Sequence, residues 1–343
     1  MSVPLVEIAG VTKHYLDNAS FLAKLMGITR SVQAVSEVSL RLERGETVGL
    51  VGESGCGKST LARCLAALET VTSGDILFDA KPVDLRSGQE FGWFRSRAQI
   101  VFQDPQSSLN RSQTIEAILA RPLTVQKRAK GAKAVRERSV ELLQLVGLDA
   151  GFLHRYPHEL SGGQRQRVGI ARALAVEPDF IVLDEPVSAL DVSIQAQIVN
   201  LLLDLQQRLG LTYLFISHDL NVVRYLADRI AVMYLGRIVE IGPAEAVYAR
   251  PRHPYTQLLL EAVPAPDPAL KDQTVLIKGE VPSPLSPPSG CPFHPRCPKA
   301  DDRCKAERPI LRSIAESVEV ACHLYESTSD PVPAIELSTT RKD

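Results

Sequence analysis

Gly52-Glu-Ser-Gly-Cys-Gly-Lys-Ser59 decides the fold, because it fits the spacing Gly-x4-Gly-Lys-Ser/Thr of a phosphate-binding loop. Glycines at these positions let consecutive backbone N–H groups curl around an anion without Cβ clashes. Lys58 would add a positive charge for the β- and γ-phosphates of a nucleotide, and the Ser59 hydroxyl would bind Mg2+. The alternative is an ordinary glycine-rich turn.

The flanking sequence favours the phosphate loop. Residues 46–52 read as a buried strand, and residues 59–68 as a helix whose positive N-terminal end faces the phosphates. We therefore expect the nucleotide to be held here by Gly52, Ser54, Gly55, Gly57, Lys58, Ser59 and Thr60.

The composition limits the possible classes of protein. The chain has 343 residues, of which 45% are hydrophobic, so a substantial core and more than one domain are expected. A net charge of -1 gives no overall basic field, and we expect no nucleic-acid partner. No apolar run reaches the length that spans a bilayer, and no signal peptide opens the chain. This predicts a peripheral membrane role at most, in a reducing cytosol where disulfides are not expected.

Short apolar strands alternate with helices, which predicts an α/β protein with a mostly parallel sheet. The expected strands are 5–12 paired with 35–42, then 48–51, 99–104, 180–184 and 211–217, and a hairpin around Gly236. Helices are expected at 134–146, 165–176 and 193–209. A long helical stretch between two strands predicts an inserted helical lobe at about residues 105–178. Prolines after Val263 mark a linker, so we divide the chain into 4–262, a small cysteine-bearing module at 263–325, and a disordered tail at 326–343.

The hydrophobic strand Phe180-Ile-Val-Leu-Asp-Glu185 ends in two carboxylates. Strand residues alternate, so Asp184 and Glu185 point opposite ways unless the turn redirects one of them. Asp184 could hold Mg2+, and Glu185 could polarise the attacking water in phosphoryl transfer. The alternative is a solvated pair of acids that closes a strand.

Leu160-Ser-Gly-Gly-Gln164 precedes a long helix. Ser161 can cap that helix, and Gly162 and Gly163 expose its first N–H groups, which makes a second anion-binding end. The simplest use of two such ends is a head-to-tail dimer, with each nucleotide between the phosphate loop of one subunit and Ser161-Gly-Gly of the other. Taken alone, the segment could be an ordinary glycine-rich helix start.

Together, these three segments resemble the ATP-binding-cassette ATPases in order and spacing over residues 4 to about 262. The resemblance implies a phosphate-loop NTPase fold of the cassette type, with an antiparallel β subdomain and an inserted helical subdomain. It implies that Tyr15 stacks on adenine and that Gln103 contacts Mg2+ and the attacking water. It also implies that His218 contacts the γ-phosphate and that Asp191 and Gln164 lie at the dimer interface. Glu185, His218, Gln103 and Lys58 would then be the catalytic residues, with Ser59, Gln103 and Asp184 around Mg2+.

Several segments are similar to the ATPase subunits of oligopeptide and dipeptide importers. These are residues 252–260, residues 290–297 and the loop from Leu16 to Gln33, together with the spelling of the phosphate loop. Asn110-Arg111 departs from the expected Asn-Pro near the membrane-subunit contact.

The resemblance implies ATP-driven import, with di- or oligopeptides as the expected cargo and nickel, opines and sugars left open. The implied partners are two transmembrane permeases, a homologous ATPase (or a second copy of this chain) and, indirectly, a solute-binding protein. The implied location is the cytoplasmic face of the bacterial inner membrane. The alternative function is a regulatory module in which ATP closes the dimer to gate a partner.

Four cysteines near the end have the spacing Cys291-x5-Cys297-x6-Cys304-x17-Cys322. Four thiolates could hold zinc or an iron–sulfur cluster, although zinc sites usually contain tighter pairs. Some members of the peptide-importer group carry a [4Fe–4S] cluster in this tail, so the resemblance implies one here. Zinc or no metal are the alternatives.

Overall fold

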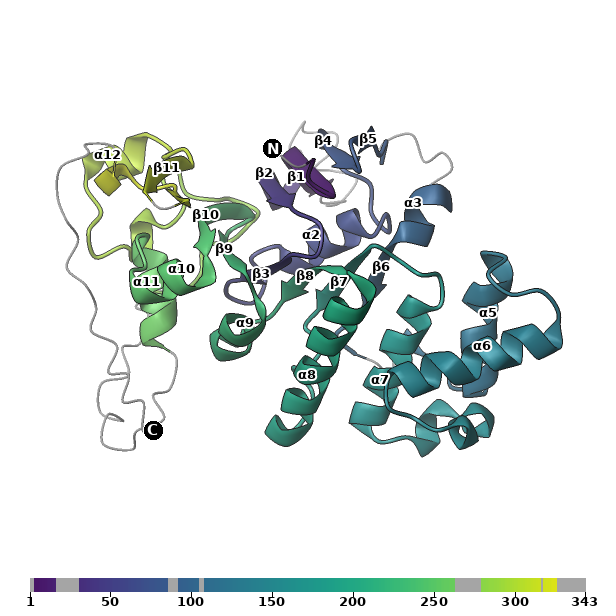
Figure 1. The fold of residues 1–343 in the computed structure, drawn as a ribbon. Helices are drawn as coiled ribbons and strands as arrows, with labels where there is room; N and C mark the ends of the chain where they lie inside the picture. Colours follow the sequence, from purple (N-terminus) through teal and green to yellow (C-terminus); the bar gives the residue numbers. More distant parts are fainter. Residues whose placement is uncertain are drawn as a thin grey trace, which may run out of the picture.

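The computed structural model describes residues 3–16, 31–85, 92–104, 108–262, 279–315 and 317–325. They form two sheets with helices around them (Figure 1). The strands are β1 (Val6–Leu16), β2 (Ser31–Leu42), β3 (Thr47–Val51), β4 (Ser73–Phe78), β5 (Lys81–Pro82), β6 (Ala98–Val101), β7 (Phe180–Asp184), β8 (Thr212–Ile216), β9 (Arg229–Tyr234), β10 (Arg237–Pro243), β11 (Arg312–Ala315) and β12 (Val318–Val320). The helices are α2 (Lys58–Leu65), α3 (Gly92–Arg97), α5 (Ile115–Val125), α6 (Ala132–Leu145), α7 (Gly162–Leu174), α8 (Val192–Leu209), α9 (Leu220–Leu226), α10 (Ala244–Ala249), α11 (Pro254–Glu261) and α12 (Asp302–Ala306). Short 3-10 turns are η1 (Ala150–His154), η2 (Pro157–Glu159), η4 (His294–Arg296) and η5 (His323–Tyr325).

The smaller sheet is antiparallel and has the order β2-β1-β4-β5. The predicted pairing of segments 5–12 and 35–42 is confirmed by the register Val6↔Leu42 to Leu16↔Ser31. Both strands are longer than predicted, so Tyr15 lies within β1 rather than beyond the end of the strand predicted at 5–12. The loop predicted between Leu16 and Gln33 falls mostly outside the described residues.

The larger sheet has the order β11-β12-β10-β9-β3-β8-β7-β6. Strands β6, β7, β8 and β3 pair in parallel, as predicted from their apolar sequences, and β9 pairs in parallel with β3. The hairpin predicted around Gly236 is confirmed, because β9 pairs with β10 in the antiparallel sense. The strand expected at 99–104 is shorter and ends at Val101, which leaves Gln103 in the loop beyond it. Because parallel strands end at the same edge, residues that follow β3, β7 and β8 meet there.

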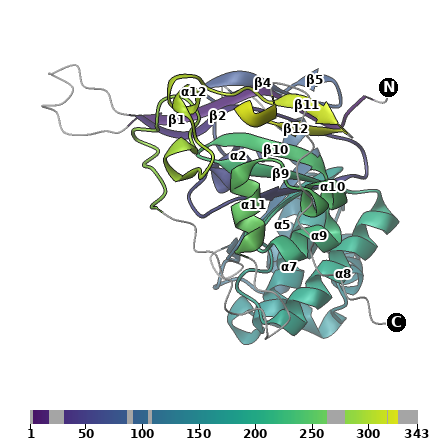
Figure 2. The same ribbon diagram turned by 90° about the vertical axis from the view of Figure 1, so that its left-hand side faces the viewer.

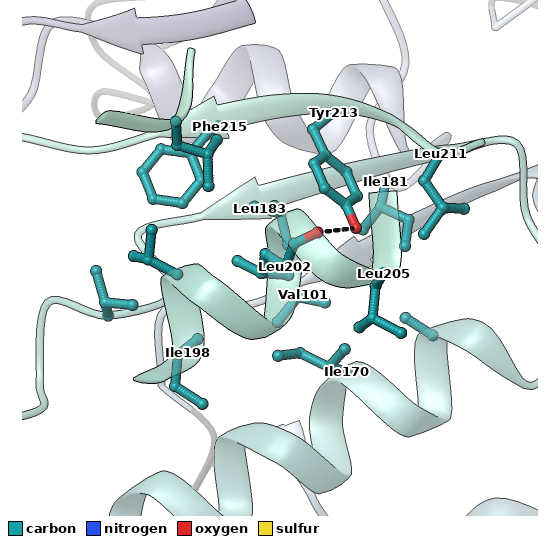
Figure 3. Close-up of a cluster of buried hydrophobic side chains, with 14 of the residues drawn as sticks. Val101, Ile170, Ile181, Leu183, Ile198, Leu202, Leu205, Leu211, Tyr213 and Phe215 are labelled. Carbon is teal, nitrogen blue, oxygen red and sulfur yellow. Dashed lines mark hydrogen bonds between the residues drawn. The ribbon is translucent and has the colours of Figure 1, made fainter. Parts of the chain in front are cut away.

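Helix α8 covers β7 and β8 on one face of this sheet (Figure 3). Its Ile198, Leu202 and Leu205 are buried among strand side chains that include Leu183 and Phe215. Burying one such aliphatic side chain contributes about 1.5–3 kcal/mol. Tyr213 is the polar member of this cluster, and its hydroxyl donates a 3.2 Å hydrogen bond to the carbonyl of Leu202. This packing fixes the strand ends that carry Asp184 and Ser217.

Helices α5, α6 and α7 lie in sequence between β6 and β7, where the helical lobe was predicted, and stand to one side of the sheet (Figure 1). Thr114 caps α5 by accepting a 3.3 Å hydrogen bond from the N–H of Ala117. Helix α7 begins at Gly162 rather than at the predicted Arg165, because Ser161 is its N-cap. The boundaries 105–178 stay a prediction.

The C-terminal segment packs against the sheet edge formed by β10, where Figure 2 shows β11 and β12 beside it. Strand β12 pairs with β10 in the register Glu240↔Val320, and β11 pairs with β12. The sequence pattern did not predict these two strands. The predicted tail at 326–343 lies outside the described residues. No helix in the described ranges combines the length and apolar composition that crossing a bilayer requires.

Candidate nucleotide site

The phosphate loop joins β3 to α2 and depends on two glycines. Gly52 has φ +152° and Gly57 has φ +107°, and a Cβ on Gly57 would lie 2.0 Å from the carbonyl oxygen of Ala34. A side chain at Gly57 would therefore displace the loop from β2. Gly57 is also the N-cap of α2, and among the described residues no side chain caps this helix end. The first N–H groups of α2 are thus directed at the loop interior.

Lys58 lies buried inside the loop, with 5% of its surface exposed. Its ammonium donates hydrogen bonds of 2.7 Å to the carbonyl of Gly52 and 3.0 Å to the carbonyl of Glu53. These bonds hold the positive charge within the curve of the backbone, where the predicted phosphates would lie.

Ser59 and Asp184 bring two oxygen donors together. The Ser59 hydroxyl donates a 3.0 Å hydrogen bond to the Asp184 carboxylate at the end of β7. Burial raises the pKa of the Asp184 carboxyl above its ordinary value, while the hydrogen bond from Ser59 lowers it. A hydroxyl and a carboxylate beside a phosphate loop fit the oxygen ligands that Mg2+ prefers.

Glu185, Gln103 and His218 form a second polar cluster. The Gln103 amide donates a 2.8 Å hydrogen bond to the Glu185 carboxylate, and Nδ1 of His218 lies 3.3 Å from the same oxygen. Glu185 has φ +47°, a left-handed conformation that is strained for a side-chain-bearing residue. The turn therefore redirects Glu185, so that the carboxylates of Asp184 and Glu185 both lie at this edge of the sheet.

Most of these groups line one cavity of about 600 Å3. The predicted site residues Gly52 and Asp184 do not line it, and Asp184 is joined to it through Ser59. The predicted residues that line it are Tyr15, Ser54, Gly55, Gly57, Lys58, Ser59, Thr60, Gln103, Glu185 and His218. Three further residues, Val32, Ala34 and Pro284, also line it. The sequence pattern did not indicate these three: Val32 and Ala34 follow from the extra length of β2, and Pro284 carries no local signal.

The segment Ser161–Gln164 does not line this cavity within one chain. Ser161 and Gln164 form a capping box, in which Ser161 Oγ accepts from the Gln164 N–H at 3.3 Å and Gln164 Oε1 accepts from the Ser161 N–H at 2.9 Å. The predicted capping by Ser161 is therefore confirmed. Asp191, the N-cap of α8, also lies outside the lining. The residues assigned to the opposite subunit are thus those that one chain keeps apart from its own cavity.

Two family profiles match the chain. The one described as ABC transporter matches residues 35–188, and the one described as oligopeptide/dipeptide transporter, C-terminal region, matches residues 239–304. A putative peptide import ATP-binding protein of Brucella ovis is 51% identical over 93% of this chain and 97% of its own length. The chain belongs to the ABC transporter ATPases. The predicted α/β cassette fold and ATPase activity are confirmed, and ATP with Mg2+ is the ligand that this family binds.

Other ABC relatives match the sequence over almost the whole chain. A putative oligopeptide transport ATP-binding protein of Bacillus subtilis is 48% identical over 95% of this chain and 97% of its own. A dipeptide transport ATP-binding protein of Haemophilus influenzae is 45% identical over 94% and 97%. Among solved structures, a dimeric ATP-binding cassette bound to ADP and phosphate has a TM-score of 0.61 at 31% identity. It covers 70% of this chain and 98% of its own.

The four cysteines of this ABC ATPase are neighbours in the structure. All are free thiols, and Cys322 interacts electrostatically with the other three. Burial raises the pKa of the Cys322 thiol to about 12 and that of Cys291 to about 11. In the part of the chain that the structure describes, no group of three or more His, Cys, Asp or Glu residues is placed to hold a metal ion. The thiols as arranged do not fit zinc, and the predicted iron–sulfur cluster has no support in the structure.

Proposed function

We propose that this chain is the ATP-hydrolysing subunit of an importer for di- or oligopeptides. One observation carries the catalytic part: the loop with Lys58, the Ser59 hydroxyl that is bonded to Asp184, and the cluster around Glu185 all lie on one cavity. The names of relatives that match almost the whole chain support the cargo class.

The site residues suggest a division of roles. Glu185 accepts the proton of the attacking water, while Gln103 and His218 position that water and the γ-phosphate. Lys58 neutralises charge that develops on the phosphates. Ser59 and Asp184, with Gln103 nearby, would hold Mg2+, which supplies further charge neutralisation on the phosphate oxygens. Tyr15, which lines the same cavity, would stack on the adenine.

The second half of the site is proposed to come from a partner ATPase. Ser161, Gly162, Gly163, Gln164 and Asp191 of one subunit would face the phosphate loop of the other. Two observations support this: these residues lie outside their own chain's cavity, and a structural neighbour is described as dimeric. We propose a homologous ATPase as the partner, with a second copy of this chain as the alternative.

The remaining partners follow from the importer class. Two permeases would contact the ATPases at the cytoplasmic face of the bacterial inner membrane, and a solute-binding protein would deliver the peptide. A groove of about 460 Å3 that includes Asn110 and Gln113 lies between α3, α5 and α7 and offers a surface for a permease. Asn110-Arg111 would tune this contact.

The cysteine tail carries a separate proposal, an iron–sulfur cluster, supported only by the cysteine spacing. Protein purified without oxygen should contain iron and acid-labile sulfide and be brown. Colourless protein that contains zinc, or no metal, would reject the cluster. No catalytic role is assigned to it.

The transport proposal is tested by reconstitution. The chain, its partner ATPase and two permeases are placed in lipid vesicles with the solute-binding protein. Uptake of labelled dipeptide should require ATP and should raise the rate of ATP hydrolysis. Hydrolysis with no uptake of peptide, nickel, opine or sugar would favour a regulatory module instead.

A further inference from the structure

The phosphate loop is held from outside the cassette core by Arg296. This residue lies in η4, between Cys291 and Cys297 of the C-terminal module. Its two terminal nitrogens donate hydrogen bonds of 2.7 and 2.8 Å to the two carboxylate oxygens of Glu53, the second residue of the phosphate loop. Such two-pronged pairing fixes both the distance and the orientation of the carboxylate.

The pair is shielded from water. The side chain of Arg296 is 4% exposed and that of Glu53 is 21% exposed, so solvent screens the interaction little. Tyr255 contributes a second anchor, because its hydroxyl accepts a 2.8 Å hydrogen bond from the Glu53 N–H. Tyr255 packs against Tyr234 and Phe293 with ring centroids 4.6 and 5.4 Å away. Phe293 is the module's own residue, so the same aromatic cluster joins the module to the loop.

Glu53 links this anchor to the catalytic lysine. Its carbonyl accepts a hydrogen bond from the Lys58 ammonium, while its carboxylate receives Arg296 and its N–H reaches Tyr255. Every polar group of Glu53 therefore makes a hydrogen bond. A shift of Arg296 would move the backbone carbonyl to which Lys58 donates.

The module reaches the cavity at a second point. The carbonyl of Pro284 accepts a 3.0 Å hydrogen bond from the Gln33 N–H of β2, and Pro284 lines the cavity together with Tyr15 and Val32. The two contacts flank the cavity, one at the phosphate loop and one beside β2.

We propose that the C-terminal module is a working part of the ATP site, in which Arg296 is a positioning residue that sets the phosphate loop through Glu53. Arg296 acts through the loop and touches no reacting atom. The inference rests on the proposed function for the identity of the nucleotide and adds a dependence of ATP affinity on the module.

The kinetic test compares Arg296→Met with the wild type in the assembled transporter. The Michaelis constant for ATP should rise about 5- to 50-fold, a coupling of ordinary size, while kcat at saturating ATP changes less than about twofold. Loss of folded protein would instead lower the apparent kcat and leave the Michaelis constant unchanged. Arg303→Met is the matched control, because Arg303 belongs to the same module but pairs with the exposed Glu307. It should leave both constants unchanged.

Loss of one partner from a shielded ion pair can itself unfold a protein, so a second set of variants is included. Arg296→Lys keeps the charge but not the two-pronged geometry, and Glu53→Gln keeps the shape of the carboxylate. The affinity of the full chain for the non-hydrolysable β,γ-imido analogue of ATP is measured for each and for the double variant. The fold-loss of affinity in the double variant should be at least five times smaller than the product of the fold-losses in the two single variants.

The outcomes separate the two proposals. A wild type that turns over no ATP would reject the proposed function and this inference together. A wild type that turns over ATP, with an Arg296→Met variant of unchanged Michaelis constant or with multiplicative losses in the cycle, would reject this inference alone.

Discussion

Two helix N-termini of this protein were both predicted to bind anions, yet they are built differently. Helix α2 begins at Lys58 after the left-handed N-cap Gly57, has no side-chain cap among the described residues, and opens into the cavity. Helix α7 begins at Gly162 and has Ser161 as its N-cap, and the capping box with Gln164 satisfies the N–H groups of Ser161 and Gln164. This second end lies outside the cavity of its own chain.

The difference indicates how the two ends are used. Among the described residues no side chain caps the α2 end, and the buried ammonium of Lys58 lies beside it. This arrangement is suited to binding a phosphate with groups of one chain alone. The α7 end is already ordered by its own side chains, while its capping box leaves the Gly162 and Gly163 N–H groups outside the two bonds. A preformed end of this kind is suited to close over a ligand that another subunit holds.

The largest effect is expected when ATP hydrolysis itself is blocked, because both helix ends are proposed to contribute to that reaction. Glu185→Gln keeps the shape of the side chain but cannot accept a proton, so turnover should fall about 10^2- to 10^4-fold while ATP binding is retained. ATP should then trap a dimer, measured by light scattering during gel filtration. Wild-type hydrolysis by this variant in the assembled complex would remove Glu185 from the role of base.

A smaller effect is expected at the α2 end alone. Lys58→Ala removes a charged donor from the loop, and hydrogen bonds to charged groups contribute about 1.5–3 kcal/mol, or roughly 10- to 150-fold in affinity. The loss should be seen in the isolated chain by calorimetric titration with the imido analogue of ATP. Equal affinity in the wild type and the variant would show that the two helix ends do not differ as described.

The smallest effect is expected at the α7 end. Ser161→Ala should leave ATP affinity of the isolated chain unchanged, weaken the ATP-dependent dimer and cost about 1 kcal/mol of stability through the lost cap. Thr114→Ala is the control, because it removes a comparable cap from α5. It should cost similar stability and leave the dimer intact. A drop in ATP affinity of the isolated Ser161→Ala chain would contradict the assignment of this end to the opposite subunit.

The sequence predicted those parts of the site that are encoded locally. The loop at Lys58, the strand that ends at Asp184 and the cap at Ser161 each depend on residues a few positions apart. The orientation of Glu185 could not be read in the same way, because it depends on φ +47° after the strand ends. Arg296 and Pro284 were missed for another reason. Arg296 pairs with Glu53 across 243 positions, and no periodicity in the cysteine-bearing segment indicates where it folds back.

The pairing of β12 with β10 has a practical consequence for expression of shortened chains. Strand β10 would be an edge strand of the larger sheet if β11 and β12 were absent. Its unpaired N–H and C=O groups would then form a ready template for another polypeptide. A chain cut after residue 262 should therefore self-associate or precipitate, even though every catalytic residue named above would still be present.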